Sequence, residues 1–114
     1  MTIPEFKIKL KITPTAITFK ETMQVIEDHY NFTPTAFTNA NIANNVGENT
    51  GSCKIFAFAT HQKLTKKEAL FCFGAHYQSV LEDDNGASHQ NIRKFMKTGF
   101  EGLSFQEEAL KLKE

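Results

Sequence analysis

Three Thr-x-x-Glu tetrapeptides constrain most strongly how this chain can fold. They begin at Thr2, Thr18 and Thr65. In a capping box of this kind, the threonine oxygen accepts a hydrogen bond from the N–H at the third helical position, and the glutamate carboxylate accepts one from the threonine N–H. Each box precedes apolar residues at helical spacing. The sequence therefore predicts that a helix begins at each of these threonines.

The segment after Thr2 fits two structures. Phe6, Leu10 and the isoleucines between and after them alternate with lysines, which is the period of a strand. The same segment also has helical spacing, and Pro4 suits the first turn of a helix. We expect a short helix that ends before Pro14.

The segment after Thr18 gives a clearer pattern. Phe19, Met23, Ile26 and Tyr30 follow one another at offsets of four, three and four, which places them on one helical face. This face is expected to pack inward, and Asn31 and Pro34 are expected to end the helix.

The segment after Thr65 predicts a second amphipathic helix. Leu70, Phe73, Tyr77 and Val80 fall on one face of a single continuous helix. The Asn85-Gly86 pair predicts the turn that follows it.

Two further helices are expected to begin at serines. Ser52 can cap a helix that runs to His61, although residues 55–59 also form a short apolar run typical of a buried strand. Ser88 can cap a helix that carries Ile92, Phe95 and Met96 on one face and ends at Gly99.

The strand signals are short. An Asn39-Ala40-Asn41 centre between apolar residues predicts a β-hairpin over residues 35–45, and residues 100–105 predict a third strand. The resulting class is α+β: mostly helical, about five helices, with a small antiparallel sheet built on a hairpin. We expect one domain over residues 1–105 and a polar C-terminal tail over 106–114 that frays.

Composition excludes several classes of partner. The 114 residues contain 13 Lys plus Arg and 13 Asp plus Glu, so no net charge draws the chain to nucleic acid or to acidic membranes. No apolar run is long enough to span a bilayer. Two cysteines, Cys53 and Cys72, are read as free thiols rather than as a disulfide. The expected compartment is the cytoplasm, with export by a route that needs no cleaved signal left open.

No motif for a cofactor or for catalysis is found. Gly47, Gly51 and Lys54 resemble a phosphate loop only loosely, because the Gly-Lys-Ser/Thr run is broken. The four histidines lack the spacing of metal-ligand pairs, so no metal and no cofactor is expected. The sequence therefore favours a protein that is not an enzyme.

One pair of residues is the better site candidate. His89 and Arg93 lie four residues apart near a predicted helix start, where free N–H groups could help to bind an anion, with charge added by Lys54. The alternative is that Arg93 pairs with a carboxylate. Two weaker candidates are a Cys72–His76 pair on one helix and a Cys53 thiol activated by a helix start.

Four segments occur in order that together resemble the HopJ type III effector family. They are Asn31-Phe-Thr-Pro-Thr-Ala-Phe37, Gly51-Ser-Cys-Lys-Ile-Phe-Ala-Phe-Ala59, Phe73-Gly74 followed by Tyr77, and His89-Gln-Asn-Ile-Arg-Lys-Phe-Met96. The resemblance covers about residues 3–105. It implies an effector role, and it transfers no activity, cofactor or catalytic residue. Ala40 departs from the glycine expected in the hairpin turn, so the shape of that turn is in question.

The family's motif places polar residues at five positions, which are the ligand-binding candidates: Ser52, Lys54, His89, Asn91 and Arg93. The function expected is a small binding or interaction module whose partner is an unknown protein or a small anionic ligand. The alternative is a small enzyme or a domain that binds an anionic metabolite through the region of His89 and Arg93.

Overall fold

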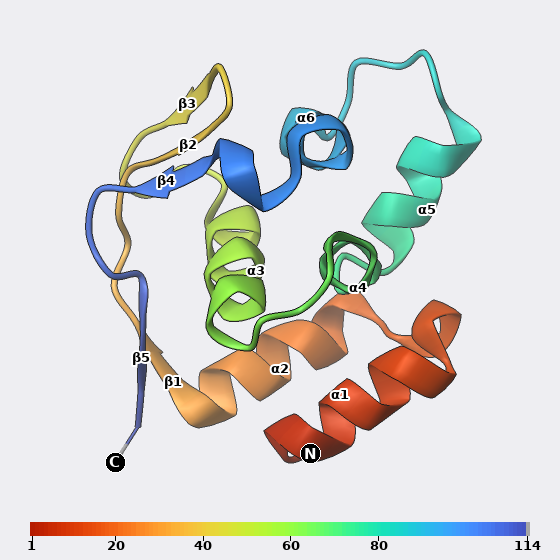
Figure 1. Ribbon diagram of the computed structural model, residues 1–114, viewed down its shortest axis with the longest axis vertical. Coiled ribbons are helices and arrows are strands. Elements are labelled where there is room, and N and C mark those ends of the chain that lie inside the picture. Colours follow the sequence, from red (N-terminus) through yellow and green to blue (C-terminus); the bar gives the residue numbers. More distant parts are fainter. Residues whose placement is uncertain (114) are drawn as a thin grey trace.

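The computed structural model describes residues 1–113 and has the expected class, mostly helical α+β (Figure 1). Its α-helices in this range are α1 (Ile3–Ile12), α2 (Phe19–His29), α3 (Thr50–His61), α4 (Lys66–Phe71), α5 (Ala75–Glu82) and α6 (Gln90–Thr98). Two 3-10 helices are η1 (Pro14–Ala16) and η2 (Gly99–Gly102). The strands are β1 (Tyr30–Phe32), β2 (Phe37–Asn39), β3 (Ile42–Asn44), β4 (Leu103–Phe105) and β5 (Leu110–Leu112).

All three capping boxes form. Thr2, Thr18 and Thr65 each accept a hydrogen bond from the N–H of the glutamate three residues on, at 3.0–3.1 Å. The glutamate carboxylates in turn accept hydrogen bonds from the threonine N–H groups, which completes the capping boxes at the starts of α1, α2 and α4. The ambiguous first segment is therefore helical and ends at Ile12, before Pro14 as expected.

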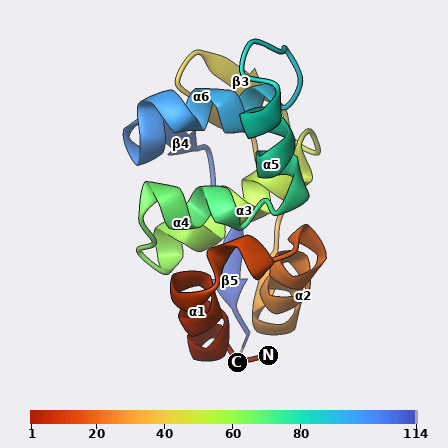
Figure 2. The ribbon, with the colours of Figure 1, turned by 90° about the vertical axis from the view of Figure 1, so that its right-hand side faces the viewer.

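Helix α3 forms the centre of the molecule. Figure 1 shows it with the strands on one side, α4 and α5 on the other, and α1 and α2 beneath, as Figure 2 also shows for α1 and α2. Its buried residues are Cys53, Ile55, Phe56, Ala57, Phe58 and Ala59. Because α3 is enclosed on nearly every side, its apolar residues are not confined to one face. A continuous apolar run of this kind is also typical of a buried strand. The expected cap is wrong: α3 begins at Thr50 with Asn49 as its N-cap, and not at Ser52.

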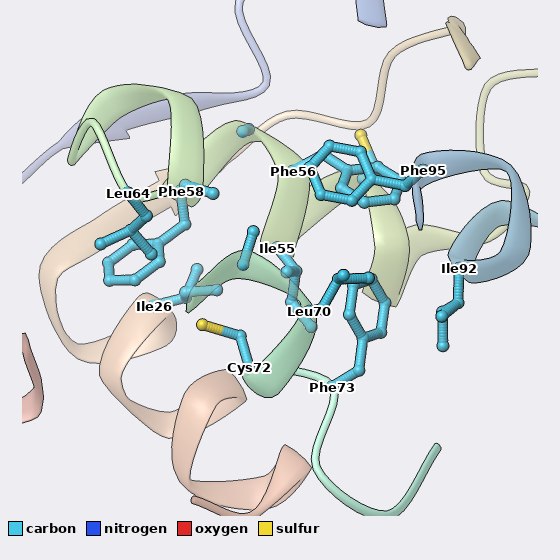
Figure 3. Close-up of a cluster of buried hydrophobic side chains, with 14 of the residues drawn as sticks. Ile26, Ile55, Phe56, Phe58, Leu64, Leu70, Cys72, Phe73, Ile92 and Phe95 are labelled. Carbon is cyan, nitrogen blue, oxygen red and sulfur yellow. The ribbon is translucent and has the colours of Figure 1, made fainter. Parts of the chain in front are cut away.

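The buried residues gather around α3 into one core (Figure 3). The residues assigned inward from helical spacing are largely confirmed, since Ile26, Tyr30, Leu70, Phe73, Tyr77, Ile92 and Phe95 are all at most 3% exposed. Phe19 and Met23 are partly buried and pack against the same cluster. None of the helices in residues 1–113 is long and apolar enough to cross a membrane.

Gly74 divides the single helix that was predicted after Thr65. Helix α4 ends at Phe71 and α5 begins at Ala75, and Gly74 between them has φ +56° and ψ −126°. A Cβ there would lie 2.7 Å from the main-chain N of Phe19. The prediction of one continuous helix is therefore wrong, because the apolar pattern continues through a change of direction that only glycine allows.

The hairpin prediction is confirmed. Strands β2 and β3 pair antiparallel with Asn39 opposite Ile42, and β4 joins the other edge of β2 to give the order β3-β2-β4. Ala40 therefore opens a two-residue turn with φ +54° and donates its N–H to Gly102 O at 2.7 Å. The turn keeps its short length despite the absence of glycine, at the cost of a left-handed alanine.

Part of the segment after Gln106 forms a strand, where a fraying tail is expected. Strand β5 pairs antiparallel with β1, and Leu110 is fully buried. Both ends of the described chain also contact His29, whose carbonyl accepts from Lys113 N–H and whose Nε2 lies 3.0 Å from Met1 O. Residues far apart in sequence thus supply this pairing, which local patterns could not reveal.

Both cysteines are free and buried, as expected. Burial raises the pKa of the Cys53 thiol and, more strongly, that of Cys72. The weaker candidate, a Cys53 thiol activated by a helix start, is therefore not supported. Cys72 and His76 are not helical neighbours either, since they flank Gly74 and only Cys72 is buried.

We predict that neither thiol reacts in the native protein at pH 8, because the thiolate is the reactive form and a raised pKa keeps it scarce. Thiol titration without reductant should count none on the native time scale and two after denaturation. A count of zero after denaturation would show that the cysteines form a disulfide.

Candidate functional site

A pocket of about 470 Å³ opens where α3, α5 and α6 begin. We call it the helix-start pocket, and its lining residues are Phe19, Ile42, Asn49, Gly51, Ser52, Phe73, His76, His89, Gln90, Asn91 and Ile92. This lining contains no lysine, arginine, aspartate or glutamate. Its electrostatic character therefore comes from main-chain dipoles and from the two histidines.

The starts of α3 and α6 differ from those of the helices with capping boxes. Their N-caps, Asn49 and His89, are left-handed, with φ of +49° and +53°, and neither start has a side-chain cap. The first N–H groups of a helix have no acceptor within the helix. A left-handed residue followed by a helical one also directs successive N–H groups into a concavity that suits an anion. The pocket thus has main-chain donors from two helices.

A network of buried asparagines holds these two starts together. Asn44 Oδ1 accepts hydrogen bonds from Asn49 Nδ2 at 2.7 Å and from Asn91 Nδ2 at 2.9 Å. Asn39 Nδ2 donates to Asn91 O at 2.8 Å. Asn39, Asn44 and Asn91 are at most 7% exposed, so these amides are shielded from water. One amide oxygen on β3 therefore sets the spacing between the start of α3 and that of α6.

Two histidines form an aromatic row along one side of the pocket. The ring centroids of His76 and His89 are 5.1 Å apart, and the Phe19 ring meets His76 edge-on at 4.8 Å. His76 comes from the first turn of α5 and His89 from the N-cap of α6. The sequence pairs His76 with Cys72, which is four residues earlier on the predicted helix. The break at Gly74 turns His76 toward His89 instead, and this break leaves no periodic signal in the sequence.

Of the five predicted binding residues, three line the pocket and two do not. Ser52, His89 and Asn91 are in its lining. Lys54 lies elsewhere, with its Nζ 3.8 Å from Glu27 Oε1 and 4.9 Å from the centre of the Phe32 ring. The predicted contribution of Lys54 to an anion site beside His89 therefore has no support from this geometry.

Arg93 holds the loop that leads into α6. Its Nε donates to Ser88 O at 2.5 Å, and its Nη1 donates to the carbonyls of Asp83 at 2.8 Å and Asp84 at 3.2 Å. The Asp83 carboxylate lies 3.8 Å from Nη2, and the arginine side chain is 12% exposed. These contacts favour the structural alternative for Arg93. Ser88 is not the N-cap that was expected, since that position belongs to His89.

Arg93 faces a second pocket, of about 490 Å³, between α5 and α6. Lys94 and Lys97 also line it. Gly86 lies so close that a Cβ there would be 2.8 Å from Arg93 Nη2, and this nitrogen is fully buried without a hydrogen-bond partner in residues 1–113. This nitrogen of the guanidinium is therefore shielded from a ligand in that pocket.

A multidentate metal centre is not assembled in the described part of the chain, where no group of three or more His, Cys, Asp or Glu side chains converges. Any ion held by the helix-start pocket would have at most two imidazole ligands from the protein.

A comparison with family models gives a match to the HopJ type III effector protein over residues 3–110, nearly the whole chain. The chain belongs to this family. A similar fold is seen in the crystal structure of the unknown-function protein VPA0580, which is 49% identical to this chain, covers 99% of it and has a TM-score of 0.96. The match spans 95% of that protein. No curated protein matches the chain.

Proposed function

We propose that this HopJ domain is a binding module whose helix-start pocket holds a small ligand through an anionic group. The observation that supports this most directly is the meeting of two helix starts without side-chain caps at one pocket. Helix starts carry partial positive charge and unsatisfied donors, and both favour an anion.

The remaining lining of the pocket fits such a ligand. No carboxylate lies in the lining to repel an anion. Ser52 can add a hydroxyl donor, and the two imidazoles can donate from their ring nitrogens. Phe19, Phe73 and the two isoleucines offer apolar surface for the uncharged part of the ligand. A small phosphate ester or carboxylate therefore matches the pocket better than a free inorganic ion does.

The proposal is tested on metal-free protein by thermal unfolding with matched pairs of compounds. Each pair has an anionic member and a neutral one, such as glycerol phosphate and glycerol. A ligand at about 100 times its dissociation constant stabilises a protein by roughly 2.7 kcal/mol. The expected result is a shift for at least one anionic member and none for its neutral partner. Equal shifts for both members would contradict recognition of the anionic group.

We predict that Ser52→Asp raises the stability of the protein and removes its response to anions. A carboxylate in the first turn of α3 interacts favourably with the helix dipole, by about 0.3–1 kcal/mol. The same carboxylate occupies the donors of the pocket and repels an anionic ligand. Denaturation with and without the anionic compound measures both effects.

Lys67→Glu provides the matched control. Lys67 is exposed in the first turn of α4, which is remote from the pocket lining. A carboxylate there should also stabilise its helix, but the response to anions should stay as in the wild type. If both variants keep the response, the ligand does not bind at the start of α3.

An effector role is the second part of the proposal, and it draws on the family description. We infer cytoplasmic synthesis, with export through a type III system as the route to a host cell. Helix α1 begins at Ile3 with a complete capping box, so an export apparatus that needs an unstructured start must first unfold it. A secretion assay with the first residues fused to a reporter tests this route.

A further inference from the structure

His76 and His89 have a mutual geometry that the anion site does not need. The two imidazoles come from different helices, yet their ring centroids lie 5.1 Å apart with planes inclined by 52°. Neither ring makes a hydrogen bond to the protein within residues 1–113, so its nitrogens are available. His89 is also left-handed, a conformation that a residue with a Cβ adopts at an energetic cost.

We propose that His76 and His89 together bind one divalent transition-metal ion at the mouth of the helix-start pocket. Metal–nitrogen bonds to histidine are about 2.0–2.1 Å long, and two imidazoles that share one ion at tetrahedral angles have ring centres roughly 5 Å apart. The observed separation matches this arrangement. Imidazole ligands suit zinc, copper and nickel, which are the expected class of ion.

The surroundings orient the His76 ring and fix the main chain directly before His89. The Phe19 ring packs edge-on against His76 at 4.8 Å, and Arg93 binds the carbonyl of Ser88 directly before His89. Rings that are oriented before the ion arrives lose less side-chain freedom on binding. The pair is therefore better organised than two freely moving surface histidines.

Both histidines are exposed and line the helix-start pocket, so we expect the remaining coordination positions of the ion to face that pocket. Partial positive charge at the starts of α3 and α6 opposes a bare cation. Water, hydroxide or an anionic group is therefore expected to complete the coordination and to reduce this repulsion. The metal site uses the same pocket as the proposed anionic ligand, but it does not depend on that ligand.

The other histidines have different surroundings and serve as controls. His29 Nε2 lies 3.0 Å from Met1 O, and the His61 ring packs against Tyr30 with centroids 5.6 Å apart. Neither pairs with a second imidazole among the contacts of the described chain.

The test is a calorimetric titration of the full chain, freed of any histidine tag and treated with chelator, with Ni²⁺, Cu²⁺ and Zn²⁺ at pH 7.5. One equivalent of at least one ion should bind. His76→Ala and His89→Gly should each weaken binding by roughly 10–100-fold or more, since even groups that only support a ligand have effects of that size. Glycine is chosen at position 89 because it accepts the left-handed conformation without strain.

His29→Ala and His61→Ala should bind the ion as the wild type does. The Cu²⁺-loaded protein should show coupling to two ring nitrogens in its electron paramagnetic resonance spectrum, and each pocket variant should lose one. No binding, or equal weakening by the control variants, overturns the proposal. The anion test uses metal-free protein, so failure of the metal site leaves that result unaffected, and the converse also holds.

Discussion

Phe56→Ala is expected to remove much of the stability of this domain, about 3–5 kcal/mol. Phe56 is fully buried on α3. Its ring contacts those of Phe95 at 4.8 Å, Phe73 at 5.5 Å and Phe37 at 6.3 Å between centroids (Figure 3 labels the first two). Truncation leaves a cavity where α3, α6 and the three-stranded sheet meet. Small domains have only about 5–15 kcal/mol of stability in total, so denaturant unfolding should show a large shift.

Two control variants separate cavity formation from loss of any apolar side chain. Phe56→Leu keeps most of the volume and should cost clearly less than the alanine variant. Ile12→Ala removes an apolar side chain that is 73% exposed and should change stability by no more than about 0.5 kcal/mol. Equal losses in all three variants would contradict the central position of Phe56.

Gly74→Ala should destabilise the protein by a similar amount, about 3–5 kcal/mol. The backbone of Gly74, with φ +56° and ψ −126°, is strained for any residue with a Cβ. The added carbon would also lie 2.7 Å from Phe19 N and 3.2 Å from Ile17 O, and main-chain atoms cannot move aside as a side chain can. Thermal and denaturant unfolding measure the loss.

Gly47→Ala is the matched control for this prediction. Gly47 has φ +87°, but nothing lies within 4 Å of a Cβ built there. This variant should lose only the conformational cost, about 1–2 kcal/mol. If Gly74→Ala costs no more than Gly47→Ala, the close approach of η1 and α2 to Gly74 is not what fixes the residue type.

The sequence predicted best those elements whose causes are local. A capping box involves four consecutive residues, so Thr2, Thr18 and Thr65 could be read directly as helix starts. The hairpin at Asn39 was also local, because a tight turn between apolar residues leaves few alternatives.

Elements whose causes are distant were missed. Helices α4 and α5 share one apolar pattern. The chain changes direction between them at Gly74, where the main chain of Phe19 approaches closely. Strand β5 exists because Leu110 reaches the core beside β1. Neither contact leaves a periodic signal in the sequence around it.

The candidate site was predicted in part for the same reason. Ser52, His89 and Asn91 were identified and do line one pocket, but Asn49 and His76 were not associated with them. The charge of Arg93 suggests an anion-binding residue, but its guanidinium donates hydrogen bonds to carbonyls of the preceding loop. Spacing along one helix predicts which side chains are neighbours. It does not predict whether a loop folds back and forms hydrogen bonds with one of those side chains.

The pairing of β1 with β5 bears on how the protein is made on the ribosome. Strand β1 (Tyr30–Phe32) leaves the ribosomal exit tunnel long before β5 (Leu110–Leu112). It therefore stays unpaired while most of the chain is still being synthesised. During that interval the edge of β1 and the contact site of Leu110 on the core are uncovered. Nascent chains stalled before residue 110 are therefore the species that a ribosome-associated chaperone should recognise.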